Sequence, residues 1–250
     1  MTAWTFHPLT YQVGWRSFGA DPPYPFQYRS TTSEMARYTR QCISASEQFE
    51  DQLDEALYQA FVVMMNPDVR IHVCGLVGPG DADKVRLYAA MRGADAVLAQ
   101  QNPGAGRTSG GSVRVTRVQR VGCGDAVARA LPNVRAGTQK RIDVDHDELP
   151  AGDGPEPRAT SWLRPADAGP TPVADATRLL ARPRTGIGRI EVYPGASLGA
   201  RDTGDGRDVR WLDVLDDGRY LLVDRARSIS ISPGGPAALR DVVQELIAPG

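Results

Sequence analysis

The chain contains two segments in which apolar and polar residues alternate on both sides of a glycine turn. Residues 85–99 read VRLYAAMRGADAVLA and residues 209–223 read VRWLDVLDDGRYLLV, with Gly93 and Gly218 at corresponding turns. Such alternation is typical of a strand with one buried face, and a glycine between two such runs favours a hairpin. The similarity of the two segments indicates an internal repeat, which restricts the fold to two similar antiparallel units.

Shorter segments extend this repeat. Upstream, the tetrapeptide that begins at Arg70 (RIHV) corresponds to the one that begins at Arg189 (RIEV), and each half continues with a further strand and a helix. Each half is therefore expected to contribute about four antiparallel strands as a meander, covered by helices because alternation leaves one face apolar. The expected strands are 69–77, 85–91, 94–101 and 112–121, then 189–193, 208–215, 219–225 and 228–232; the expected helices are 123–131, ended by Pro132, and 236–247.

The remaining segments complete an α+β chain. The opening WTFHPLTYQVGWRSFG predicts a short strand and a short helix, and the stretch from TTSE to Pro67 predicts two helices. We interpret the chain as a single domain, 1–250. It has an N-terminal half (1–132), a Gly- and Pro-rich connector (133–171) with one strand at 141–145, and a C-terminal half (172–250) that opens with a helix at 172–183.

Charge and composition exclude several classes of protein. The formal net charge of −1 gives no reason to expect binding to nucleic acid or to an anionic membrane. The longest apolar run, AFVVMM at 60–65, is far shorter than a membrane span of about 20 residues, and no secretory signal is recognisable. The 3 cysteines form no CxxC pattern. We therefore expect a cytoplasmic protein with free thiols.

One motif suggests a serine hydrolase. Residues 195–199 read GASLG, which matches the G-x-S-x-G nucleophile elbow and makes Ser197 a candidate nucleophile. The elbow requires a helix after the serine and a histidine later in the chain. The following ARDTGDGRD does not favour a helix, and His7, His72 and His146 all precede Ser197. A loop between two strands is the preferred interpretation.

Other motifs do not support a catalytic, metal or cofactor site. Residues 102–111, NPGAGRTSGG, lack the spacing and the following helix of a phosphate-binding loop and are interpreted as a flexible hairpin loop. His72 lies on the polar side of a strand and is expected to be exposed. His146 lies among acidic residues in DVDHDEL, where consecutive side chains point in different directions and a solvated helix start is favoured over a metal site. A core-forming chain without a catalytic constellation favours a binding protein.

The order of segments resembles the EspG family, the secretion-associated chaperones of type VII (ESX) systems in mycobacteria and related actinobacteria. The resemblance covers nearly the whole chain. It is carried by WTFHPLTYQVGW, PYPFQYRST, NPDVRIHV, RLYAAMRGADAVLAQ, NPGAGRTSGG, SVRVTRV and, best of all, the segment DGRYLLVDRARSISISPGGPAALRDVVQELI at 217–247.

The resemblance implies a central antiparallel sheet with a quasi-two-fold relation between its halves and two helical subdomains. It also implies a cytosolic chaperone without enzymatic activity or cofactors, which binds PE–PPE heterodimers at the tip of the PPE helical bundle; a homodimer is left open. In the family, the loop between the second and third strands and the C-terminal helical part contribute to binding, which here suggests residues 102–111, 172–182 and 236–247. The candidate contacts are Arg107, Thr108, Ser109, Arg178 and Gln244. The short connector at 150–170 implies a smaller helical part than is usual in the family.

Overall fold

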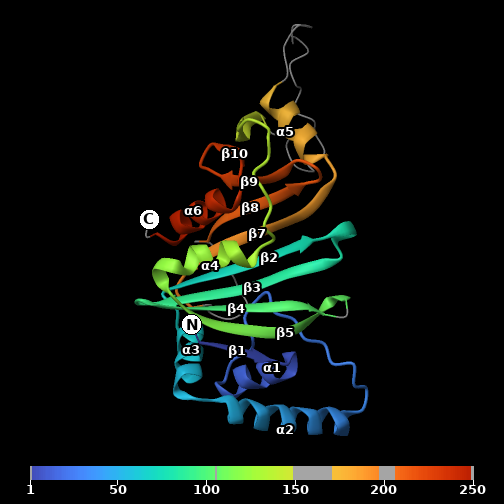
Figure 1. Ribbon diagram of the computed structural model, residues 1–250, viewed down its shortest axis with the longest axis vertical. Coiled ribbons are helices and arrows are strands. Elements are labelled where there is room, and N and C mark those ends of the chain that lie inside the picture. The colour runs from blue at the N-terminus through green and yellow to red at the C-terminus, as the bar shows by residue number, and fades with distance from the viewer. Residues whose placement is uncertain (1, 105, 149–170, 197–205, 249–250) are drawn as a thin grey trace.

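Two meanders form one antiparallel sheet in the computed structural model, which describes residues 2–104, 106–148, 171–196 and 206–248. The first meander consists of β2 (Val69–Val77), β3 (Asp83–Arg92), β4 (Asp95–Gly104) and β5 (Gly106–Gln119). The second consists of β7 (Arg184–Pro194), β8 (Arg207–Val214), β9 (Gly218–Asp224) and β10 (Ser228–Pro233). Strands β2 and β7 pair antiparallel and join the meanders (Figure 1). The predicted α+β fold is confirmed.

Two short strands lie at the edges of this sheet. Strand β1 (Ala3–Phe6) pairs with β5, and β6 (Ile142–Asp145) pairs with β10. Across the described residues the strand order is β1-β5-β4-β3-β2-β7-β8-β9-β10-β6. The strand expected in the connector therefore exists, and it lies at the outer edge of the second meander.

The register of β2 and β7 places the quasi-two-fold axis. The repeat makes Ile71 the counterpart of Ile190, and Val73 the counterpart of Val192. In the sheet Ile71 pairs with Val192, and Val73 pairs with Ile190. Each of these two residues of β2 therefore lies opposite the counterpart of its neighbour two positions along the strand. His72 lies opposite its own counterpart, Glu191. The axis therefore passes between these two residues, at the middle of the sheet.

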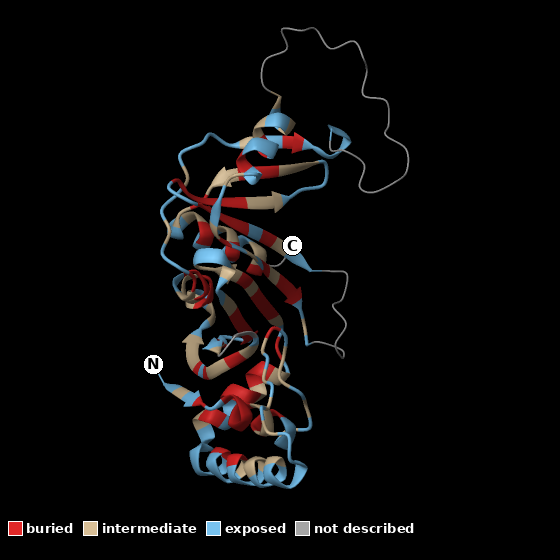
Figure 2. Ribbon diagram, turned by 90° about the vertical axis from the view of Figure 1, so that its right-hand side faces the viewer, coloured by how far each residue is buried: buried red, intermediate tan, exposed pale blue. Residues whose placement is uncertain are grey.

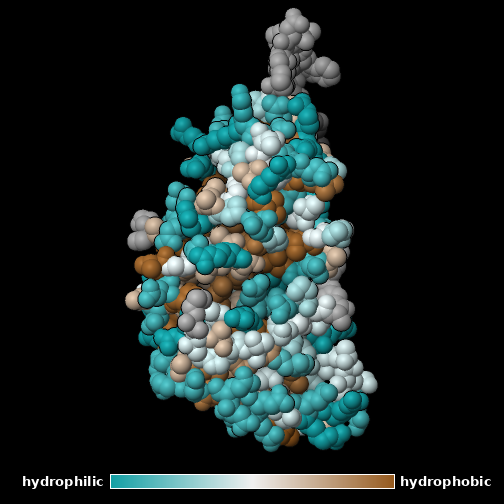
Figure 3. All heavy atoms as spheres, in the orientation of Figure 1, coloured by the Kyte–Doolittle hydropathy of each residue, from teal (hydrophilic) through white to brown (hydrophobic). Residues whose placement is uncertain are grey.

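One face of the central strands is apolar and packed under two helices. Helix α4 (Cys123–Ala130) follows β5, helix α6 (Pro236–Ile247) follows β10, and α4 crosses in front of the sheet in Figure 1. We call this face the covered face. Its buried core includes Ile71, Val73, Leu87, Ala89, Met91, Cys123, Val127, Ile190, Val192, Val209, Trp211, Leu239 and Val243. In the same orientation, Figure 3 shows apolar side chains as a band across the middle of the molecule.

Trp211 lies flat on the covered face because two glycines leave room for its indole. Gly75 of β2 lies opposite Gly188 of β7. A Cβ atom added to Gly188 would lie 2.1 Å from the Trp211 ring, and one added to Gly75 would lie 2.5 Å from it. Glycine at both positions therefore lets the largest fully buried side chain cross the junction between the meanders.

The opposite face, which we call the open face, carries helices only over its two outer parts in the described chain. At the N-terminal end, α1 (Pro8–Ser17) and α3 (Glu55–Met65) pack on β3, β4 and β5, and α2 (Met35–Gln52) packs on α1 at the bottom of Figure 1. Figure 2 shows α2 as mostly exposed. At the other end, α5 (Pro172–Leu180) packs on β8, β9, β10 and β6. The middle of the open face lies between these two layers.

Two sequence-based expectations require correction. Residues 102–111 were expected to be a flexible loop, but β4 continues to Gly104 and β5 begins at Gly106. The absence of a side chain at Gly110 leaves room for Gln101, whose side chain exchanges hydrogen bonds with the Gln27 backbone at 2.8 and 3.0 Å. This segment also connects β4 to β5, whereas the connection between β2 and β3 is residues 78–82.

Candidate functional site

A groove of about 1230 Å³ lies on the open face between the two helical layers. Strands β2, β7 and β8 form its floor. Residues 19–24 and the end of α3, at Met64 and Met65, form one wall, and Leu180 at the end of α5 lies on the other side. The groove therefore spans the junction of the two meanders.

One cross-strand row is rich in arginine, and its members Cys74, Arg189 and Arg210 line the groove. Cross-strand pairing places Arg86, Cys74, Arg189 and Arg210 side by side on β3, β2, β7 and β8. Arg86 is buried, and burial lowers its pKa, whereas the side chains of Arg189 and Arg210 are 47% and 58% exposed. Because like charges directly opposite each other destabilise a sheet, this row requires compensation by negative charge.

The next row supplies part of that compensation. It consists of Tyr88, His72, Glu191 and Asp208 in the same strand order. Arg189 lies 3.0 Å from Glu191 and 3.1 Å from Asp208, and Asp208 also lies 3.6 Å from Arg210. Burial lowers the pKa of Arg189, but the hydrogen bond to Asp208 and the two negative charges outweigh burial and leave the pKa raised.

His72 is buried in this row, contrary to the expectation that it is exposed. The rings of Tyr24, Tyr88 and Tyr193 surround its imidazole, with centroids 5.4 to 5.6 Å away. Alternation along one strand shows that a residue lies on the polar face. It does not show that residues 19–24 and two neighbouring strands enclose that position.

Arg70 lies beyond His72 along β2 and is buried under Tyr193. Its guanidinium lies 4.7 Å from the centre of that ring. It donates hydrogen bonds to the carbonyl oxygens of Pro194 and Gly195, at 3.0 and 2.7 Å. Arg70 therefore holds the chain where β7 ends, at the side of the groove.

The opposite end of the floor is apolar. Leu76, Ile187 and Leu212 form the row that follows the arginine row. Ile187 is 38% exposed, and Leu180 on the neighbouring wall is 47% exposed. The groove thus presents apolar side chains beside a charged row.

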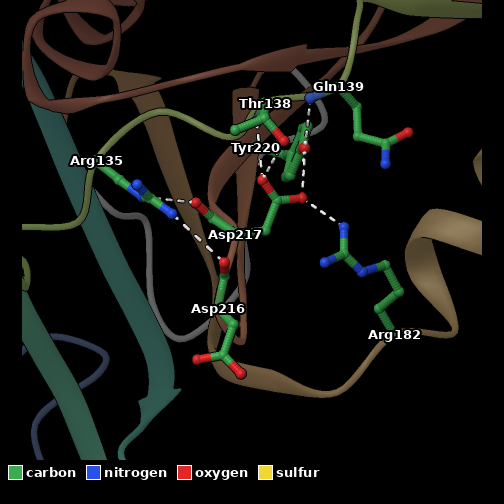
Figure 4. Close-up of polar contacts among 7 residues, drawn as sticks. All are labelled: Arg135, Thr138, Gln139, Arg182, Asp216, Asp217 and Tyr220. Carbon is green, nitrogen blue, oxygen red and sulfur yellow. Dashed lines mark hydrogen bonds and ion pairs between the residues drawn. The ribbon is translucent and has the colours of Figure 1, made fainter.

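A buried carboxylate fixes the end of α5 beside this apolar end (Figure 4). Asp217, in the turn between β8 and β9, accepts hydrogen bonds from Thr138 N, Thr138 Oγ1 and Tyr220 Oη, each at 2.8 Å, and from Arg182, which follows α5. Burial alone would raise the pKa of Asp217, but these hydrogen bonds lower it to about 2. Asp217 therefore links the connector, the hairpin and the residues after α5.

The structure does not bring the five candidate contact residues together. The backbone of Arg107 lies in β5 with Thr108, which is exposed, and Ser109, which is half-buried. Arg178 lies on α5 and pairs with Asp175 at 2.9 Å. Gln244 is exposed on α6, where it packs near Gly124 of α4 on the covered face. The groove lining includes neither of the two described β5 side chains, Thr108 and Ser109, nor Arg178 or Gln244.

Sequence reasoning missed the groove residues, although a signal for them exists. Arg70, His72, Arg189 and Glu191 are polar positions on two strands that the repeat makes central. This sheet has helices over its outer parts. Polar residues on its middle strands therefore indicate a face that is not packed against a helix there. The missing information was that β2 and β7 pair with each other.

The other motifs have a simple placement. Ser197 lies outside the described residues. His7 caps α1 by accepting a hydrogen bond from Leu9 N at 3.3 Å, and His146 lies 3.0 Å from Asp224. Among the helices in the described ranges, none has the length and apolar character needed to cross a membrane.

Comparisons with known proteins identify a family and a fold. The model of the EspG family matches residues 7–245. Among 14 matching chains of solved structures is the Mycobacterium tuberculosis type VII secretion system chaperone EspG5, in complex with a PE25-PPE41 dimer. It is 15% identical, with a TM-score of 0.53, and the match covers 98% of this chain and 96% of that chain. This likeness shows a shared fold. A comparison with curated protein sequences gives no match.

Proposed function

The chain belongs to the EspG family, and on this premise we propose that it is a type VII secretion chaperone whose cargo is a PE–PPE dimer. EspG5 has the same fold and is found in complex with a PE25-PPE41 dimer, which supports this choice of partner. We propose that the groove on the open face receives the tip of the PPE subunit in the cytoplasm and covers apolar surface that would otherwise aggregate.

The observation that carries the proposal is the chemistry of the groove. Its volume of about 1230 Å³ exceeds the roughly 300–1,000 Å³ of ordinary small-molecule sites, which favours a segment of protein as the occupant. Exposed Ile187 and Leu180 offer contacts to an apolar tip, and Arg189 and Arg210 beside them offer polar contacts. An apolar centre with polar contacts around it is the usual arrangement of a protein interface.

Co-expression with the PE–PPE pairs encoded in the same genome tests the proposed partner. We expect at least one pair to co-purify with the chain through affinity and size-exclusion steps, and to remain soluble at concentrations where the pair alone precipitates. Failure of every pair to co-purify would contradict the proposed function.

A pair of matched variants tests the place of binding. Ile187→Asp introduces a charge at a 38% exposed apolar position inside the groove, and Val121→Asp does so at an 82% exposed apolar position outside it. We expect Ile187→Asp to abolish co-purification and Val121→Asp to preserve it, with both variants folded by circular dichroism. Equal binding by the two variants would place the interface elsewhere.

The proposal assigns no catalytic step to the chain. We expect purified protein to show no hydrolysis of p-nitrophenyl esters above the buffer rate. Esterase activity that disappears in Ser197→Ala would instead support the hydrolase interpretation of the GASLG motif.

A further inference from the structure

We infer that the groove selects cargo whose bound tip carries an acidic side chain, and that Arg210 binds this carboxylate beside Arg189. The inference rests on the proposed function and concerns which cargo is chosen. It follows from the arrangement of charge on the groove floor.

The first observation is that two arginines lie directly opposite each other on neighbouring strands. Arg189 of β7 is the cross-strand partner of Arg210 of β8 on the open face. Their side chains are 47% and 58% exposed, whereas those of Glu191 and Asp208, the carboxylates beside them, are 14% and 19% exposed. The charges that a ligand meets at this place are therefore positive.

The second observation is that the two arginines are not equally engaged. Arg189 is held from two sides, by Glu191 at 3.0 Å and Asp208 at 3.1 Å. Arg210 has one ion pair among the described residues, with Asp208 at 3.6 Å, and Asp208 is shared with Arg189. Arg189 is thus positioned within the protein, while much of the Arg210 guanidinium is available to a ligand.

These observations favour a carboxylate as the ligand group. A carboxylate accepts charge-assisted hydrogen bonds from guanidinium donors in a planar geometry, and it relieves the repulsion between the two opposed cations. Leu222 lies directly opposite Arg210 on β9, and Ile187 lies two residues before Arg189 on β7. The preferred tip therefore combines an acidic side chain with neighbouring apolar ones.

The test compares Arg210→Gln with Arg117→Gln. Arg117 also lies on a strand and pairs with an aspartate, Asp95 at 3.3 Å, but it does not line the groove. The probe is each PE–PPE pair that co-purifies with the unchanged chain, and Kd is measured by isothermal titration at low and high salt. We expect Arg210→Gln to raise Kd roughly tenfold at low salt, with a weaker salt dependence, and Arg117→Gln to change Kd less than about twofold.

Charge exchange completes the test. Arg210→Glu is expected to weaken binding further, and replacing the acidic residue at the PPE tip by lysine is expected to restore it. Unchanged affinity and unchanged salt dependence in Arg210→Gln, with a pair that binds the unchanged chain, would overturn this inference and leave the proposed function intact. Failure of every pair to bind the unchanged chain would overturn both.

Discussion

The covered and open faces of the central sheet are built by alternate residues of the same two strands. On the covered face, Ile71 and Val73 of β2 meet Ile190 and Val192 of β7 under two helices. On the open face, His72 meets Glu191 in a groove. The backbone relation is close to two-fold on both faces, so the difference lies in the side chains and in what covers them.

Equivalent positions in the two halves show what this difference means. On the covered face the counterparts are alike, Ile71 with Ile190 and Val73 with Val192, because both must fill a close-packed core. On the open face even the identical pair Arg70 and Arg189 has different surroundings, since Arg70 is buried under Tyr193 and the Arg189 side chain is 47% exposed. The covered face therefore stabilises the fold, and the open face is available for recognition.

The largest loss of stability is expected from a substitution on the covered face of β8. Trp211→Ala removes a fully buried ring from the covered face and leaves a cavity over Gly75 and Gly188. We expect a loss of about 3–5 kcal/mol in the free energy of unfolding, measured by urea denaturation.

The neighbouring residue supplies the control for this change. Arg210→Ala removes a 58% exposed side chain from the open face of the same strand. We expect it to cost less than about 1 kcal/mol, because exposed ion pairs contribute little. Comparable losses of stability in the two variants would contradict the conclusion that the covered face stabilises the fold more than the open face does.

A smaller effect is expected where α5 is attached at the side of the open face. Asp217→Asn removes a carboxylate whose pKa is lowered from 3.8 to about 2. A depressed folded-state pKa stabilises the fold above the unfolded pKa, and this stabilisation is lost as pH falls toward 2. We expect a cost of about 2 kcal/mol at pH 7, and a shallower decline of stability between pH 5 and pH 2 than in the unchanged chain.

The adjacent aspartate provides the matched control. Asp216 has a positive φ of 61°, which asparagine also tolerates, and its backbone oxygen accepts the hydrogen bond from Arg135. Asp216→Asn should therefore leave both the stability at pH 7 and its pH dependence nearly unchanged. An equal response of the two variants would show that the hydrogen bonds of Asp217 do not determine the effect.

The reactivity of the cysteine thiols compares the two faces without any mutation. Burial under the covered face raises the pKa of the Cys123 thiol to about 12, so on the order of one molecule in ten thousand carries the thiolate at pH 8. Cys74 in the groove and Cys42 on α2 are half-buried. We expect an aromatic disulfide reagent to modify Cys74 and Cys42 in the native protein, and Cys123 only after unfolding. Rapid native modification of Cys123 would contradict its burial.

The strands of the sheet could be predicted from the sequence because alternation is a local signal. The register of β2 on β7 could not, since pairing between distant strands is decided by how both halves pack. Residues 102–111 were misjudged because glycine was interpreted as a sign of flexibility, whereas Gly110 leaves room for the Gln101 side chain in a continuing hairpin.

The candidate site was harder to predict than the fold. The family resemblance suggested Thr108 and Gln244, among others, and both lie away from the groove. The groove residues are separated by more than a hundred positions along the chain, as Cys74 and Arg189 show. They form one floor only after the two halves assemble around the axis at His72 and Glu191.

Cargo that occupies the open face between the helical layers would cover Cys74, so protection of this thiol reports whether the groove is the binding site. The native chain is labelled with a maleimide reagent, with and without a co-purifying PE–PPE pair at about 100 times its Kd, and both half-buried thiols are followed by mass spectrometry. Occupation of the groove predicts that modification of Cys74 slows on the order of 100-fold while modification of Cys42 on α2 continues at its original rate. An unchanged rate at Cys74 in the presence of bound cargo would show that cargo binds elsewhere on the protein.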